Sequence, residues 1–142
     1  MTSNDLLLAS LGACGRFQFS PVQIQKLLFL IERNIGDKVG GPHFVFKPYD
    51  YGPFDSSIYA LLREMQEKGL VEPTPSAGTW NYYSLTPSGL IESEKVTSSV
   101  DQTSLNYIKK ASHFVRNVSF TDLVASIYKA YPEMRVNSVF KG

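Results

Sequence analysis

The chain has 142 residues, of which 43% are hydrophobic and 13% aromatic, a size and composition typical of one globular domain with a substantial core. Fourteen Lys and Arg side chains nearly balance thirteen Asp and Glu, and the net charge of +1 excludes a strong overall attraction to nucleic acid or anionic membranes. The single cysteine, Cys14, excludes an internal disulfide and is typical of a reducing compartment.

The two ends of the chain differ in charge. Residues 1–94 contain seven basic and ten acidic side chains, whereas residues 95–142 contain seven basic and three acidic ones. Apolar stretches such as LLLASLGAC are too short to span a bilayer, and no basic segment precedes an apolar run at the N-terminus. We therefore expect a cytoplasmic protein with no membrane partner, whose positive charge lies in its C-terminal third.

Two helices are predicted first along the chain. Residues 4–13, NDLLLASLGA, are compatible with a short helix. The next helix has Ser20 as its N-cap, Pro21 at its first helical position and Gln23 as the partner in a capping box. Gly36 is predicted to end this second helix.

The middle of the chain combines a buried helix with a segment rich in glycine and aromatic residues. The apolar run LLFLI at 27–31 covers nearly every side of the second helix, which predicts that this helix lies in the core. HFVFK, at 43–47, is predicted to form a short strand, and Gly52-Pro53 is predicted to form a turn.

A third helix is predicted to begin near Asp55 and to end at Gly69, a favourable C-cap residue. One side of this helix is expected to face the core, because apolar residues recur there at helical spacing: Ile58, Leu61, Leu62 and Met65. The opposite side is expected to face solvent, and it carries Ser56, Ala60, Arg63 and Glu67, flanked by Tyr59.

A β-hairpin is predicted next, with GLVEP and TWNYYSL as strands and TPSAG as the loop. Alternation along the second strand places Trp80 and Tyr82 on one face and Tyr83 and Leu85 on the other. Some aromatic surface is therefore expected to stay exposed. Thr86, followed by a proline, is the predicted N-cap of a further helix.

Two more helices are predicted in the C-terminal third. Ser98 and Ser99 offer overlapping capping boxes for a helix over about 100–117. A last helix is predicted to begin near Ser119 and to end before Pro132, because the residue before a proline is pushed out of the helical region.

This order of elements predicts a mainly helical α+β fold with a small β-hairpin. Helices followed by a hairpin and another helix are typical of a winged-helix domain, in which the hairpin is the wing. We assign residues 1–97 to a winged-helix-like unit and residues 98–142 to a C-terminal helical hairpin that extends it. The extension is too small to fold alone, so we expect one folded domain.

Catalytic motifs are absent from the sequence. Cys14 with His43 or His113 would make a nucleophile and base, but no local signature surrounds them. Two histidines and one cysteine without short spacing do not predict a metal site. The glycines of VGGPHF lack the Lys and Ser or Thr of a phosphate-binding loop. We expect no enzymatic activity, no cofactor and no metal.

The winged-helix prediction raises the possibility of DNA binding. Winged-helix proteins place the third helix in the major groove, and Ser56, Tyr59 and Arg63 would form the reading face here. Residues 69–94, which include the whole wing, contain no Lys or Arg, and phosphate binding depends on such cations. The composition of the wing therefore argues against ordinary duplex recognition.

A cationic stripe is predicted on the helix over 100–117. Lys109, His113 and Arg116 recur at i, i+4 and i+7, and Lys110 lies beside them. The stripe is either a solvated face or a binding site for nucleic acid or an acidic partner.

Aromatic residues gather around the Gly52-Pro53 pair. We predict that Tyr49, Tyr51, Phe54 and Tyr59 form the edge of a protein-binding surface, with Arg63 as the charged neighbour. The alternative is that these rings fill the space between the third helix and the wing.

The segments IQKLLFLIER, YDYGPF, IYALLREMQEKGLVE and YYSLTPSG together resemble the Panacea or SocA-like antitoxin group of small bacterial and phage proteins, over residues 20–95. That resemblance implies a non-catalytic protein that neutralises a toxin by direct contact, sometimes as an adaptor toward a protease. The favoured hypothesis is thus a winged-helix interaction protein of antitoxin or adaptor type. A DNA-binding transcriptional regulator is the alternative, and a small enzyme is the third possibility.

Overall fold

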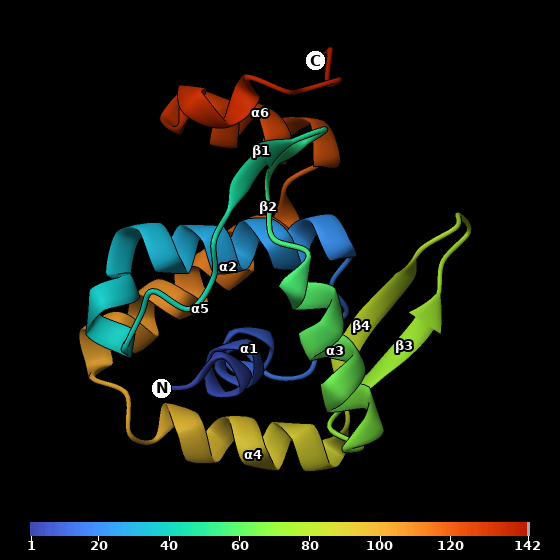
Figure 1. Ribbon diagram of the computed structural model, residues 1–142. Coiled ribbons are helices and arrows are strands. Elements are labelled where there is room, and N and C mark those ends of the chain that lie inside the picture. The colour runs from blue at the N-terminus through green and yellow to red at the C-terminus, as the bar shows by residue number, and fades with distance from the viewer. Residues whose placement is uncertain (142) are drawn as a thin grey trace.

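The computed structural model describes residues 1–141, and Gly142, the last residue of the predicted C-terminal hairpin, lies outside them. The fold is mainly helical with two small antiparallel β-hairpins, an α+β arrangement as the sequence predicts (Figure 1). The elements in chain order are α1 (Ser3–Gly12), α2 (Pro21–Ile35), the 3-10 helix η1 (Gly36–Val39), β1 (Lys47–Tyr49), β2 (Gly52–Phe54), α3 (Ser57–Glu67), β3 (Val71–Pro75), β4 (Asn81–Leu85), α4 (Pro87–Thr97), α5 (Gln102–Asn117), α6 (Phe120–Ala130) and the 3-10 helix η2 (Pro132–Arg135).

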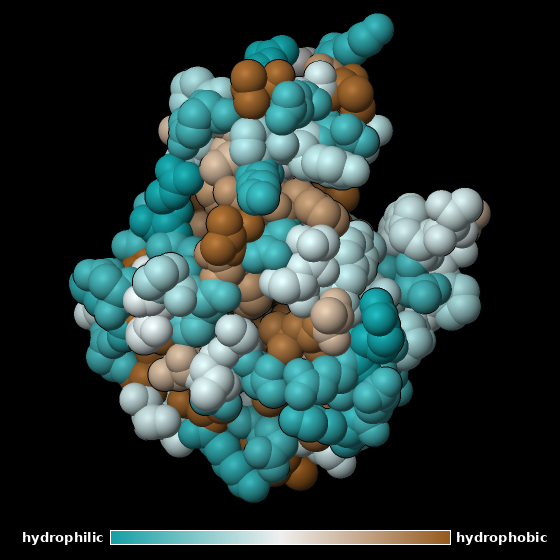
Figure 2. Space-filling model, viewed as in Figure 1, coloured by the Kyte–Doolittle hydropathy of each residue, from teal (hydrophilic) through white to brown (hydrophobic). Residues whose placement is uncertain are grey.

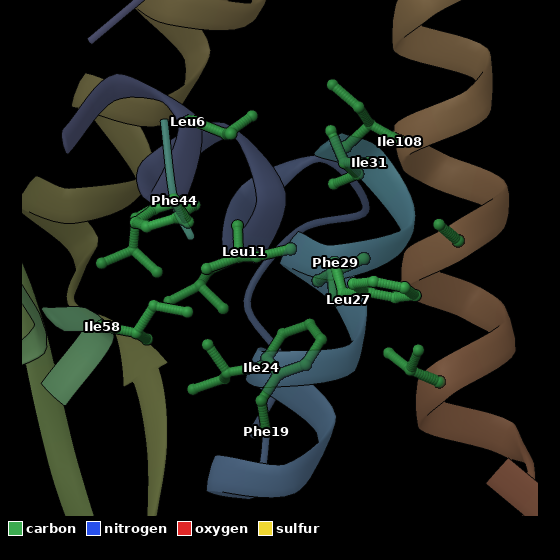
Figure 3. Close-up of a cluster of buried hydrophobic side chains, with 14 of the residues drawn as sticks. Leu6, Leu11, Phe19, Ile24, Leu27, Phe29, Ile31, Phe44, Ile58 and Ile108 are labelled. Atoms are coloured by element: carbon green, nitrogen blue, oxygen red, sulfur yellow. The ribbon is translucent and has the colours of Figure 1, made fainter. Parts of the chain in front are cut away.

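Helix α2 lies at the centre of the molecule. It packs along α5, and α1 lies between these helices and α4 (Figure 1). The β1–β2 hairpin runs from α2 toward α6 and η2, whereas the β3–β4 hairpin projects to one side. One hydrophobic cluster joins side chains from α1, α2, α3, α5 and α6 (Figure 3).

The sequence signals of α2 are confirmed at its start and at its end. Ser20 Oγ accepts from the Gln23 backbone N–H at 3.2 Å, and Gln23 Oε1 accepts from the Ser20 N–H at 2.7 Å, which completes the predicted capping box. Leu27 and Leu28 are fully buried, as the apolar run predicts. Helix α2 ends at Ile35 with Gly36 as its C-cap, as predicted; the chain then continues as η1 to Gly40, whose φ is +81°.

The Gly52-Pro53 pair does not form the predicted turn. Both residues belong to β2, where Gly52 pairs with Tyr49, and the turn consists of Asp50 and Tyr51. The φ of Gly52 is +105°, a region open mainly to glycine. The side chains of Lys26 and Tyr128 lie directly against it, within 3.6 Å of where a Cβ would stand.

The strand predicted over residues 43–47 is also wrong, since β1 begins only at Lys47. Side chains bind the backbone of this segment in place of a neighbouring strand. The His43 N–H donates to the Glu32 carboxylate at 2.9 Å, and the Val45 N–H donates to the Asp55 carboxylate at 2.7 Å. These donors are thus satisfied without a sheet.

Helix α3 and the hairpin after it follow the predictions. The four predicted inward residues of α3 are buried: Ile58, Leu61, Leu62 and Met65. Strands β3 and β4 pair in antiparallel register from Val71 opposite Leu85 to Pro75 opposite Asn81. Thr86 Oγ1 accepts from the Gly89 N–H at 3.0 Å and caps α4, as expected.

The start of α5 differs from the prediction. Asp101 is its N-cap, and its carboxylate accepts from the Ser104 N–H at 2.9 Å, an interaction that also lowers the pKa of Asp101. Ser98 and Ser99 instead end α4 and donate from their hydroxyls to carbonyls one turn earlier. A carboxylate at a helix N-terminus gains additionally from the helix dipole, which favours Asp101 over the serines. Ser119 caps α6 as predicted.

Candidate functional site

Three of the predicted binding residues form a continuous row of rings. Tyr49 stacks on Phe54 with 4.9 Å between ring centroids and an interplanar angle of 23°. Phe54 in turn lies 5.9 Å from the ring of Tyr59 on α3. Tyr49 is 54% exposed and Tyr59 is 37% exposed, so neither side chain is buried in the core.

Tyr51 belongs to the same surface but makes different contacts. It projects from the β1–β2 turn, is 41% exposed, and meets Phe120 edge to face with 5.2 Å between centroids. Phe120 is the first residue of α6 and is itself 47% exposed. The turn thus reaches across to the C-terminal helices.

These rings border a groove with a volume of about 700 Å³. We call it the aromatic groove, and its aromatic side chains are Tyr51, Tyr59, Trp80, Tyr82 and Phe120. The first turn of α2, with Pro21 and Val22, forms the remaining wall. Figure 2 shows the hollow between the projecting β3–β4 hairpin and the rest of this face.

The sequence prediction did not include three residues of the aromatic groove in the binding site: Trp80, Tyr82 and Phe120. Trp80 packs edge to face on Tyr82 at 4.7 Å, and both lie on the same face of the hairpin, as the alternation along β4 indicates. That alternation was the available signal for including them in the site. Phe120 gave no comparable signal, because its place beside Tyr51 depends on how α6 packs.

Beneath the β1–β2 hairpin lies a smaller cavity of about 230 Å³. Four of the predicted binding residues line it: Tyr49, Tyr51, Phe54 and Tyr59. Lys26 of α2, only 3% exposed, also lines it and donates from Nζ to the Pro53 carbonyl at 3.4 Å. Burial lowers the pKa of Lys26 to about 8. We call this space the Lys26 cavity.

The predicted cations do not gather into one site. Arg63 on α3 and Ser56 at the N-cap position of that helix are exposed, and α3 packs against β3 and α1. Lys109, Lys110 and His113 are exposed on α5, which packs chiefly against α2. Arg63 therefore lies on a different part of the molecule from the α5 stripe.

Arg116, the last member of the predicted stripe, already makes contacts within the molecule. Its guanidinium lies 3.9 Å from the centre of the Phe17 ring, and its Nε donates to Ser112 Oγ at 3.3 Å. Intramolecular contacts thus hold this guanidinium, which reduces the charge that α5 offers to a ligand.

The candidate catalytic residues have local structural contacts. The Cys14 thiol lies 3.6 Å from the Lys109 carbonyl. His43 is held by the Glu32 carboxylate on one ring nitrogen and by the Met1 carbonyl, 2.8 Å away, on the other. Within residues 1–141, His, Cys, Asp and Glu side chains do not gather in groups of three that would suit a metal ion.

Models of known protein families do not match the chain, and a comparison with curated proteins finds no similar sequence. In the part of the chain that the structure describes, every helix is too short or too polar to cross a membrane.

Proposed function

We propose that this protein is a non-catalytic interaction module that binds a partner protein through the aromatic groove. The observation that carries the proposal is the meeting of half-exposed rings from separate elements around one hollow: Tyr51, Tyr59, Trp80 and Phe120. Tyrosine and tryptophan are enriched at protein interfaces because each offers a large, rigid contact area with a polar end.

The surroundings of the groove support this proposal because they hold the rings in place. The Asp50 carbonyl in the β1–β2 turn accepts from the Val139 N–H at 3.0 Å and from the Ser138 hydroxyl at 3.2 Å. At the other end of the hairpin, the Gln25 amide exchanges two hydrogen bonds with the Asp55 backbone, at 3.0 and 2.9 Å. Rings that are already ordered lose little entropy on binding.

A winged-helix architecture of antitoxin or adaptor type is part of the proposal. Three helices precede the β3–β4 hairpin, and α3 leads directly into it, an order typical of winged helices. The resemblance of residues 20–95 to the Panacea or SocA-like group favours a toxin, or a target delivered to a protease, as the partner.

DNA binding is the second candidate, favoured by the exposed cations Arg63, Lys109 and Lys110. The wing argues against it, since residues 69–94 carry no cation and Trp80 and Tyr82 line the groove. A DNA-binding protein would show a steep loss of affinity with increasing salt, whereas binding through apolar rings depends less on salt.

Capture of the partner tests the proposal. Immobilised wild-type protein is expected to retain a specific protein from a lysate of the native host, and Tyr51→Ala and Tyr59→Ala are expected to retain much less. Ile91→Ala is the matched control, because Ile91 is an exposed apolar residue of α4 that does not line the groove. Equal retention by all variants would contradict the proposal.

A further inference from the structure

We propose that the Lys26 cavity receives an acidic side chain, Asp or Glu, of the partner protein, and that the Lys26 ammonium binds its carboxylate. The inference rests on the proposed function, because the same partner segment would occupy the aromatic groove and the cavity beside it. Tyr51 and Tyr59 line both spaces and so join them into one surface.

The first observation is an incompletely satisfied ammonium. A lysine carries three N–H donors, and a buried donor without a partner costs free energy. Lys26 Nζ has one hydrogen bond, at a long 3.4 Å, to the Pro53 carbonyl. Within residues 1–141, no carboxylate lies within 4 Å of this ammonium.

The second observation is that neighbouring polar groups are already engaged elsewhere. Both ends of the Gln25 amide bond the Asp55 backbone. The Asp55 carboxylate in turn accepts from Val45 and from Ser57. An anion entering the cavity therefore finds Lys26 as the cationic donor and competes with neither of these contacts.

The cavity suits a carboxylate on an apolar stem better than a phosphate. Its walls are mostly apolar, and it offers one ammonium, whereas phosphate sites usually supply several N–H donors. Asp50 also lines the cavity, and its negative charge disfavours a doubly charged group more than a singly charged one. One carboxylate beside apolar neighbours matches a short acidic and hydrophobic segment of a protein.

The energetics favour this occupant because the cost of burying Lys26 is already borne by the folded protein. The lowered pKa of Lys26 reflects that cost. A partner carboxylate would add an opposite charge in a water-poor site and would raise the pKa of Lys26 toward its ordinary value. Only the partner's own carboxylate would have to lose water.

The experiment uses random linear peptides displayed on phage, selected in parallel on wild-type protein and on Lys26→Met. Methionine keeps the length and apolar stem of lysine without its charge. On the wild type we expect Asp or Glu to be enriched at one fixed distance from an aromatic or aliphatic anchor. On Lys26→Met we expect the anchor to remain and the acidic preference to vanish.

A second arm needs no variant of the protein and holds even where Lys26→Met fails to fold. The best wild-type peptide is synthesised with its Glu or Asp changed to Gln or Asn, and its affinity is expected to fall about tenfold or more, as for the loss of a buried charged hydrogen bond. An unchanged affinity would overturn the inference.

The outcomes separate the inference from the proposed function. Peptides with an apolar anchor but no fixed acidic position would overturn the inference and leave the proposed function standing. Failure to enrich any sequence, or enrichment of peptides that bind Tyr59→Ala equally well, would contradict the proposed function and the inference with it.

Discussion

Helix α2 has two faces that differ in what folding leaves exposed. On one face Ile24, Leu27 and Leu28 are fully buried in the hydrophobic cluster, in which Figure 3 labels Ile24 and Leu27. On the other, Lys26 borders a cavity, and beside it lies the aromatic groove, where Tyr51 remains 41% exposed. The side chains of one face are buried, whereas the other face borders exposed apolar surface and carries an ammonium with unused hydrogen-bond donors.

The difference indicates how substitutions on each face should act. Removing a buried side chain from the core face leaves a cavity and lowers the free energy of unfolding. Removing a half-exposed ring from the groove face costs little in folding but removes an anchor for a partner. The following predictions test this division, beginning with the largest expected effect.

The largest effect is expected for Leu28→Ala. Because Leu28 is fully buried, the change should lower the free energy of unfolding by about 2 to 5 kcal/mol, measured by chemical denaturation. Ile91→Ala on the exposed surface of α4 is the control and should change it by about 0.5 kcal/mol or less. A loss below about 1 kcal/mol for Leu28→Ala would contradict the assignment of this face to the core.

The pH dependence of stability should reveal Lys26. Its folded pKa of about 8 lies below its ordinary value of 10.5, so between these two values the unfolded chain binds the proton and the folded chain does not. The free energy of unfolding of the wild type, measured relative to Lys26→Met, should therefore rise by about 3 kcal/mol as pH increases through this window.

The comparison with Lys26→Met cancels the contributions of the other titrating groups, which both proteins share. A difference between the two proteins that stays flat, or that falls as pH increases, would show that the Lys26 ammonium is not desolvated in the folded protein.

Ring substitutions in the groove and in the adjoining Lys26 cavity should affect affinity more than stability. Tyr49→Ala, Tyr51→Ala and Tyr59→Ala, made singly, should include changes that cost about 2 kcal/mol of partner affinity while the melting temperature changes little. Melting and partner capture are measured side by side. If all three lower the melting temperature and none weakens capture by the folded fraction, the rings stabilise the fold and do not bind the partner.

The smallest effect is expected on the cationic surfaces. Arg63→Ala and Lys109→Ala should leave partner capture unchanged, because neither residue lines the groove. Binding to random duplex DNA is measured by gel shift at low salt and is expected to be absent. The DNA-binding alternative would instead be supported by a gel shift in which each substitution reduces the slope of log affinity against log salt concentration by about one.

The helices could be predicted because their signals are local. Ser20 with Gln23, Thr86 and Ser119 each cap a helix through residues only three positions away, so the sequence alone contains both partners. The Gly52-Pro53 pair differs from the prediction because the chain turns at Asp50 and Tyr51 instead, and Gly52 packs against Lys26 and Tyr128, which are distant in sequence.

The candidate site could be predicted only in part for the same reason. Tyr49 and Phe54 are close in sequence and stack across one hairpin, and Tyr51 lies in its turn, so the sequence predicts their association. Phe120 and Lys26 join them through the packing of α6 and α2, which short-range patterns do not encode. The lysine directly before the apolar run of α2 is nevertheless a signal, because a helix that is apolar on nearly every side tends to bury it.

Trp80 provides the most direct test of the aromatic groove. It is the only tryptophan in the chain and lines the groove, so its fluorescence reports on this site alone. A peptide without tryptophan that the wild type retains is titrated against the protein. We predict a saturable change in Trp80 emission at the concentration where the peptide binds, and a shift to higher concentration for Tyr59→Ala. Binding that leaves the emission of Trp80 unchanged would contradict the assignment of the groove as the partner site.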